Sequence, residues 1–227
     1  MNKQSFFIDD LKINIKKNRK NRRIRLTINS TGEINVTIPT YTSYKAGLNF
    51  AKSKIDWIKK KKPEKKIYQD NQQIGKNHHL SLCPDNQDNL RSKVTLTDII
   101  IKYPKTYDYD SQIVQEYISK VTSRALKKEA ENLLPQRLRQ LSLKYQLPYN
   151  QLKIRNLKSR WGSCNSLKVI TLSQNLLNLP WELIDYVIIH ELIHTRHMNH
   201  SIEFWNNFDK LMPNNKNIRK KLKKSIY

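Results

Sequence analysis

The first forty residues alternate apolar and polar side chains with a period of two. Residues 11–15 and 24–28 follow this pattern, which is typical of strands with one buried face. Residues 30–33 have the composition of a hairpin-like turn, and residues 34–38 alternate again before Pro39 ends the run. We therefore expect a small sheet near the N-terminus.

A helix is expected next, followed by a less regular stretch. Four apolar residues at a spacing of three or four predict the helix: Leu48, Ala51, Ile55 and Ile58. The basic residues 59–62 and then Pro63 should end it. Further on, residues 80–82 and 94–103 predict a hairpin around the polar loop 84–89.

The second half of the chain changes to helical periodicity. Apolar residues recur at intervals of three and four between residues 111 and 145. Pro135 is expected to kink or restart this helix, and Pro148 should close it. We place a domain boundary near residue 107. It separates a smaller, basic, β-rich module (1–107) from a catalytic α+β module (108–227).

A buried helix should begin at Pro180, because proline suits the first helical turn. Residues 183–193 are apolar on nearly all sides, so this helix belongs inside a core. Within it the sequence places His190, Glu191 and His194, the pattern H-E-x-x-H. Two histidines and a glutamate in such a setting are costly to desolvate without a partner, and a metal ion is the common one. Purely structural histidines are the alternative.

The spacing of H-E-x-x-H has a chemical reason. Residues four apart lie on one face of a helix, so the imidazoles of His190 and His194 can reach one ion. Glu191 projects from the neighbouring face. There its carboxylate can hold a metal-bound water and take the proton as that water attacks a carbonyl or phosphoryl centre. We therefore expect a hydrolase with one zinc ion per chain and Glu191 as the general base.

A catalytic zinc site needs a third protein ligand and an open fourth position. We choose His200, because a turn at residues 198–199, with Asn199 in the left-handed conformation, would bring it back over the site. His197 would share the ligand face only if the helix continued. Three ligands along one straight helix cannot surround an ion tetrahedrally. Glu203 is the other alternative.

Further short motifs surround this pattern. In order, they are R-W-G-S-C at residues 160–164, V-I-T-L-S at 169–173, I-D-Y-V at 184–187, R-H-M-N-H-S at 196–201 and F-W at 204–205. Together with H-E-x-x-H they resemble the YgjP-like metallopeptidase domain family, strongly over residues 108–227 and also in the preceding β-rich stretch. That family is usually described as zinc-dependent and peptidase-like, and it is related to the SprT and WLM groups that act around DNA.

The resemblance implies a zincin-like α+β fold. Its active-site helix would pack on a small mixed sheet, with His190, His194 and His200 as zinc ligands. Metzincins share this ligand spacing but have glycine where this chain has His197, so we do not assign the chain to that clan. The remaining pair, His78 and His79, lies in a polar loop and is expected to be exposed rather than to bind metal.

The R-W-G-S-C motif is our candidate for substrate binding. Trp161, Gly162 and Ser163 are expected to form an edge strand that lines the cleft, since glycine allows close backbone approach. A plain structural turn is the alternative. Arg160 would polarise a substrate oxygen or bind phosphate, unless it pairs with a carboxylate.

The net charge of +24, from 43 Lys and Arg against 19 Asp and Glu, changes the picture. A field of this strength attracts polyanions, unless it reflects only a composition rich in Asn and Lys. The basic runs 12–25 and 59–66 would hold a nucleic-acid backbone without sequence readout. Because aromatic residues are sparse in these runs, stacking on bases is not expected.

Three functions follow from these observations. The leading hypothesis is a zinc-dependent metallopeptidase that uses a metal-bound water activated by Glu191. The charge motivates an alternative, a metal-dependent nucleoside triphosphate pyrophosphatase (for example UTP-type), because a basic cleft would concentrate polyphosphate. A third hypothesis is a nucleic-acid-associated metalloprotein. The substrate is therefore expected to be a peptide or a nucleotide.

The expected location is the cytoplasm. Cys83 and Cys164 have no paired spacing, which argues against a disulfide scaffold and fits a reducing compartment. The N-terminal residues contain no apolar segment of the secretory type. No apolar run is long enough to span a bilayer, so no membrane association is expected.

Overall fold

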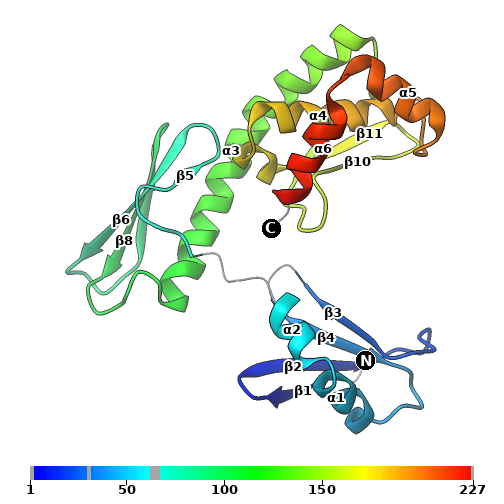
Figure 1. Cartoon of the computed structure of the whole chain (residues 1–227). Coiled ribbons are helices and arrows are strands. Elements are labelled where there is room, and N and C mark those ends of the chain that lie inside the picture. Colours follow the sequence, from blue (N-terminus) through cyan, green and yellow to red (C-terminus); the bar gives the residue numbers. More distant parts are fainter. Residues whose placement is uncertain (1–2, 30–31, 62–66, 226–227) are drawn as a thin grey trace. The chain divides into compact units, whose positions relative to one another are not determined.

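The computed structural model describes residues 3–29, 32–61 and 67–225, which form an α+β protein (Figure 1). The described residues divide into two compact units, one up to residue 61 and the other from residue 67 onwards. The division therefore lies at residues 62–66 and not near residue 107, the position expected from the sequence. Part of the turn expected at 30–33, and the end of the basic run 59–66, lie outside the described residues.

The first unit is a four-stranded sheet with two helices on one face (Figure 1). Its elements are β1 (Lys3–Ile8), β2 (Leu11–Lys17), β3 (Arg25–Ile28), β4 (Ile34–Ile38), α1 (Tyr44–Lys52) and α2 (Ile55–Lys61). The strand order is β1-β2-β4-β3, with β2 and β4 parallel. The strands expected near residues 11–15, 24–28 and 34–38 are confirmed, whereas the single expected helix is two helices.

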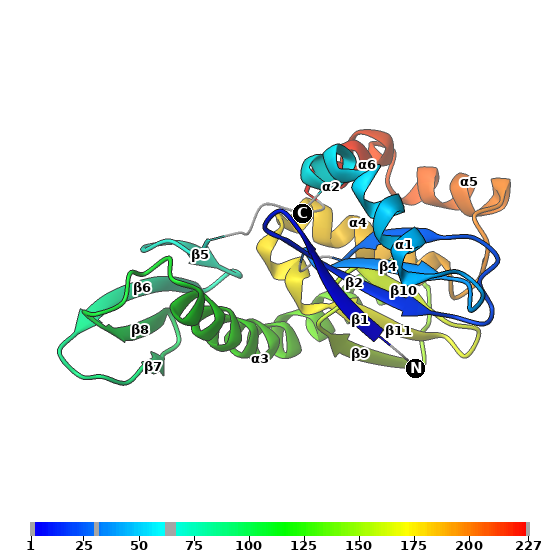
Figure 2. The ribbon, with the colours of Figure 1, turned by 90° about the horizontal axis from the view of Figure 1, so that it is seen from below.

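The second unit is built along one long helix, α3 (Gln112–Tyr145), which carries a sheet towards each end (Figure 2). Pro135 lies inside α3 and does not end it. The helix stops after Tyr145 because Gln146 takes a left-handed conformation with φ of 54° and turns the chain away. Arg137 of α3 makes a paired hydrogen bond to Asp185, which ties this helix to α4 (Trp181–Ile193).

The first sheet of this unit packs on the N-terminal half of α3. It consists of β5 (Gln73–Ile74), β6 (His78–Asp85), β7 (Arg91–Val94) and β8 (Asp98–Pro104) in the order β5-β6-β8-β7. The hairpin expected around residues 84–89 is wrong, because β6 pairs in parallel with β8. Leu80, Ile99 and Ile101 share one core with Val114 and Ile118 of α3. This shared core is why residues 67–107 belong to the second unit.

A buried carboxylate fixes the turn between β5 and β6. Glu129 of α3 accepts hydrogen bonds from the backbone N–H groups of Lys76 and Asn77, at 2.7 and 3.0 Å, and its other oxygen lies 3.0 Å from His78 Nδ1. Gly75 has a positive φ, and a Cβ there would clash with the carboxylate. The expectation that His78 is exposed is therefore wrong, whereas His79 is exposed.

The second sheet of this unit supports helix α4. It contains β9 (Gln151–Arg155), β10 (Gly162–Cys164) and β11 (Val169–Ser173) in the order β10-β11-β9, with β9 parallel and β10 antiparallel to β11. The chain continues through a 3-10 turn (Gln174–Asn178), α4 (Trp181–Ile193), α5 (Ile202–Leu211) and α6 (Asn215–Lys224). As expected, α4 packs on this small mixed sheet, and β10 is its edge strand.

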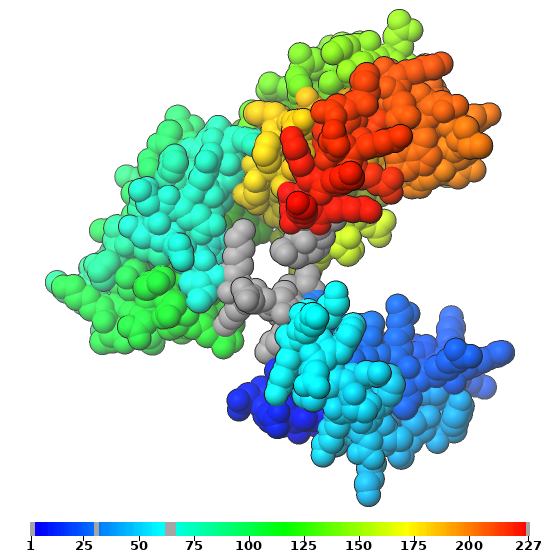
Figure 3. All heavy atoms as spheres, in the orientation of Figure 1, coloured from blue at the N-terminus to red at the C-terminus, as the bar shows by residue number. Residues whose placement is uncertain are grey.

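The C-terminal helices complete the largest core. Residues of α3, α4, α5 and α6 enclose it together with β11. On the surface of the second unit, α5 and α6 lie next to each other, in orange and red (Figure 3). Among the described helices, none is long and apolar enough to cross a membrane. Both cysteines are free thiols.

Candidate metal centre

The core determines where the H-E-x-x-H side chains lie. Pro180 precedes the first turn of α4, and the helix is buried on most sides by apolar residues. It ends at Ile193, so His190 lies in its last turn and His194 follows immediately. The two imidazoles are therefore one turn apart at the end of a rigid, buried element.

Three histidine side chains converge at this point. The Nε2 atom of His190 lies 3.2 Å from Nε2 of His194 and 3.0 Å from Nε2 of His200. One ligand atom from each of the three lies within 4.8 Å of those of the other two, and no other group of this kind is found in the described part of the chain. The sequence predicted these three residues together, and the structure brings them together; their role as ligands stays a prediction.

The return of His200 is explained by the segment after α4. The chain bends at Met198 and Asn199, as expected, but Asn199 is not among the described non-glycine residues with positive φ. Ser201 then caps α5, because its hydroxyl accepts a hydrogen bond from the backbone N–H of Phe204. The ring of Trp205, one turn into α5, stacks on His200 with a centroid distance of 5.7 Å.

The two alternative third ligands are engaged elsewhere. The Nε2 atom of His197 lies 2.8 Å from the amide nitrogen of Asn207, and its Nδ1 lies 3.6 Å from a carboxylate oxygen of Glu203. The Glu203 side chain itself is largely exposed. The backbone carbonyl of His197 lies 2.9 Å from Nδ1 of His194. Donation from this Nδ1–H would fix the ring and leave the Nε2 lone pair facing the other histidines.

The three imidazoles fit a cation. Burial first, then the neighbouring His194, His200 and Arg219, lower the pKa of His190 to about 3. Burial also lowers the pKa of His194. Both rings are therefore neutral near pH 7, the form that binds metals. The ring nitrogens that face one another can each offer a lone pair. A metal ion between them would accept these lone pairs.

Glu191, which follows His190 in the chain, is buried in the protein interior. The residue is 5% exposed. Burial raises the pKa of its carboxyl to about 8, and the positive charge of Arg160 opposes that rise. A Cβ at Gly162 would lie 2.8 Å from both Cγ and Oε1 of Glu191. The close approach that the sequence predicted for Gly162 is thus one between strand β10 and the Glu191 side chain.

The other residues of the R-W-G-S-C motif have different surroundings. Arg160 is exposed and precedes β10. Trp161 is half-buried against the main core, and its backbone carbonyl accepts a hydrogen bond from Ser173 at 2.8 Å. Ser163 is half-buried in β10 and pairs with Thr171. None of these contacts tests the expected substrate binding, which stays a prediction.

Sequence reasoning missed Arg219. This exposed residue of α6 lies over the ring of Trp205, with its guanidinium carbon 4.8 Å from the ring centroid. Its positive charge lowers the pKa of His190 and opposes the burial that raises the pKa of Tyr186. No motif marks Arg219, because only the packing of α6 beside α4 brings it to the site.

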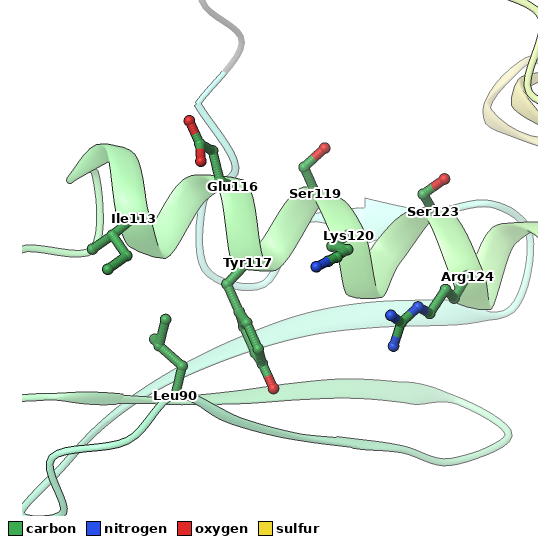
Figure 4. Close-up of a pocket in the computed structure, with 8 residues that line it drawn as sticks. All are labelled: Leu90, Ile113, Glu116, Tyr117, Ser119, Lys120, Ser123 and Arg124. Carbon is green, nitrogen blue, oxygen red and sulfur yellow. The ribbon is translucent and has the colours of Figure 1, made fainter.

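A separate pocket lies along the N-terminal half of α3 (Figure 4). It is lined by Leu90 and by α3 side chains from Ile113 to Arg124. Tyr117 points from α3 towards β7, where its hydroxyl donates to the Ser92 hydroxyl. The pocket contains one carboxylate, Glu116, and none of the histidines, so we do not place the reaction there.

Comparisons with known proteins returned a family match and a structural match. The model of the YgjP-like metallopeptidase domain matches residues 22–225. One solved structure, the metallopeptidase zymogen of Pyrococcus abyssi abylysin, is 27% identical to the chain. The match covers 39% of this chain and 90% of that one, with a TM-score of 0.36. None of the curated proteins compared with the chain matches it.

Proposed function

The chain belongs to the YgjP-like metallopeptidase domain family, and on that premise we propose that it is a zinc-dependent peptidase with His190, His194 and His200 as metal ligands. The observation that carries this proposal is the convergence of three imidazoles, next in the chain to the buried carboxyl group of Glu191. A metal-dependent hydrolase of this kind needs a cluster of metal ligands and a general base near it, and the histidines and Glu191 are the side chains we propose for these roles.

Each side chain has a distinct task in the reaction. A zinc ion held by the three imidazoles would polarise a substrate carbonyl and lower the pKa of a water molecule. Glu191 accepts a proton from the attacking water on its carboxylate and returns it to the leaving amine. In the metal-free protein burial raises the pKa of Glu191 to about 8, so this carboxyl binds a proton readily. A zinc ion at the three histidines would favour the carboxylate form, which is the one that accepts the proton.

The surrounding residues hold these groups in place. The carbonyl of His197 orients His194, and Trp205 packs on His200. Gly162 leaves room for the Glu191 side chain. Strand β10, which contains Gly162, is one of the two edge strands of its sheet. An edge strand has unpaired backbone groups with which an extended peptide can pair, and this favours a peptide substrate.

The phosphoanhydride alternative rests on charge alone. The family match is to a metallopeptidase domain, so it does not favour a nucleoside triphosphate substrate. Arg160 and Arg219 supply positive charge close to the site. They can equally bind a peptide carboxylate or stabilise the charge that develops on a carbonyl oxygen.

The test is a substrate screen with the zinc-loaded full chain. Casein, a peptide library and a panel of nucleotides should be assayed, with the metal content measured on the same sample. We expect peptide-bond cleavage that is lost on chelation and restored by zinc, and the Glu191→Gln variant is the inactive control. Nucleotide hydrolysis that depends on Glu191, without any peptide cleavage, would overturn the proposal.

A further inference from the structure

The register of the first unit's sheet separates its side chains into two faces. One face is apolar and is covered by α1 and α2. It includes Phe6, Ile8, Leu11, Ile13, Ile15, Leu26, Ile28, Ile34, Val36 and Ile38. Because side chains alternate along each strand, the residues between these belong to the opposite face. Neither α1 nor α2 contributes to that opposite face, which we call the open face.

The open face is polar, basic and without acidic residues among its strand positions. Across β1, β2, β4 and β3 it carries Lys3, Ser5, Phe7, Lys12, Asn14, Lys16, Asn35, Thr37, Arg25 and Thr27. The register places Lys3 directly opposite Lys16 and Phe7 directly opposite Lys12. Like charges in direct opposition destabilise a strand pair. A bound anion between Lys3 and Lys16 would remove that cost.

The loop between β2 and β3 adds more positive charge. Its four basic side chains are Arg19, Lys20, Arg22 and Arg23. Among the described residues, no carboxylate lies within 4 Å of these four or of Lys3, Lys12, Lys16 and Arg25. The basic groups of the open face and its loop are thus available to a polyanion.

We propose that the open face of this sheet, with the β2–β3 loop, binds single-stranded nucleic acid. Phe7 stands on it with 70% of its surface exposed. Flanked by Lys12 across the strand pair, its ring offers a platform on which a base can stack while lysines hold the phosphates. The sequence led us to expect no base stacking within the basic runs 12–25 and 59–66. Phe7 lies outside both runs, so that expectation does not apply to it.

The chemistry of the face favours a single strand over other polyanions. A flat sheet with amide and hydroxyl groups can meet unstacked bases, which a duplex keeps inside. Asn35 and Thr27 supply such groups on this face, whereas Asn14 is buried and accepts a hydrogen bond from the Ser5 hydroxyl. An anionic membrane needs a larger apolar contact, and Phe7 is the single large apolar side chain among the strand positions of this face.

The test measures binding of fluorescent 20-nucleotide single strands to the full chain by anisotropy. A variant with Lys12, Lys16 and Arg25 all changed to Glu should bind at least tenfold more weakly. A plot of the logarithm of the binding constant against the logarithm of the salt concentration should also be less steep, by about 2. Each phosphate that a basic side chain neutralises contributes roughly 0.7 to that slope, and the variant removes three such side chains. The matched control changes Lys45, Lys52 and Lys54 to Glu. These residues belong to the helical layer, so this variant should keep most of the affinity.

Substitutions of Phe7 provide a second, independent test of the proposal. Phe7→Ala should weaken binding about tenfold without changing the salt slope, and Phe7→Trp should restore it. Unfolding curves of each variant establish that the fold is kept, and Lys12, Lys16 and Arg25 changed to Gln serve as a milder replacement if Glu disturbs it. Equal losses in the face and control variants, full affinity of Phe7→Ala, or tighter binding to duplex or to phosphatidylserine vesicles would each overturn the proposal.

Discussion

Replacement of Gly162 by alanine should slow hydrolysis by roughly tenfold to a hundredfold while the metal stays bound. A Cβ at this position would lie 2.8 Å from Cγ and Oε1 of Glu191 and 3.1 Å from Cδ. Ordinary van der Waals contact begins at 3.4 Å, so the carboxylate must retreat by about 0.6 Å. The backbone of β10 cannot yield easily, because Gly162 is paired with Leu172 of β11.

The magnitude follows from the position of the general base. A displacement of about 1 Å in a reacting group can reduce the rate on the order of a hundredfold, and the shift at Glu191 is somewhat smaller. The crowding should also destabilise the fold by about 1–3 kcal/mol, as extra methyl groups in packed regions do. The three atoms nearest to such a Cβ all belong to Glu191 and none to a histidine, so we expect zinc affinity to be unchanged.

The assay compares kcat/KM on the best substrate from the screen, zinc content and thermal unfolding for Gly162→Ala and the wild type. Ser166→Ala is the matched control, because it changes one exposed side chain in the turn that follows β10 and leaves Glu191 its space. Its activity should stay near the wild-type level. A wild-type rate in Gly162→Ala would refute the reasoning, and so would a loss of zinc, which would place Gly162 at the metal instead.

The remaining predictions concern the metal centre. Elemental analysis should find about one zinc per chain, and His190→Ala should lose it. Glu191→Gln should keep the zinc but lose hydrolysis, because an amide cannot accept the proton. In the metal-free protein, burial raises the pKa of Glu191 from an ordinary 4.5 to about 8. Between these two pH values the folded chain keeps a proton that the unfolded chain has lost, so the free energy of unfolding should fall as pH rises from 4.5 to about 8. The melting temperature of the metal-free Glu191→Gln variant should not show this fall. In zinc titrations, His200→Ala should weaken binding far more than His197→Ala, and the reverse order would make His197 the third ligand.

Local patterns in the sequence predicted the elements that carry the site. Apolar residues all round α4, with three polar residues among them, predicted a buried helix with a metal-binding end, and the structure has that helix. The bend at Met198 and Asn199 that returns His200 also agrees, although Asn199 needs no left-handed conformation for it. These features depend on residues within ten positions of His190, where spacing and geometry are directly linked.

Features that depend on distant residues were not predictable in this way. The parallel pairing of β6 with β8 joins segments separated by a third strand, and alternation alone does not define a partner. His78 looked exposed because its neighbours are polar, but its partner Glu129 lies 51 residues away. Arg219 reaches the site only because Ile218 and Leu222 anchor α6 in the main core. Tertiary packing decides all three cases.

The buried Glu129 connects these distant features to the reaction. Its carboxylate binds the β5–β6 turn, and the same turn reaches the start of the active-site helix, where the N–H of Gly75 donates to the Asn178 side chain at 3.0 Å. The Lys76 ammonium donates to the carbonyl of Leu179, two residues before α4. A fragment that began at residue 108 would leave a buried carboxylate without these donors, which is strongly destabilising. The sheet before residue 107 is therefore part of what holds α4, and with it the histidines, in place.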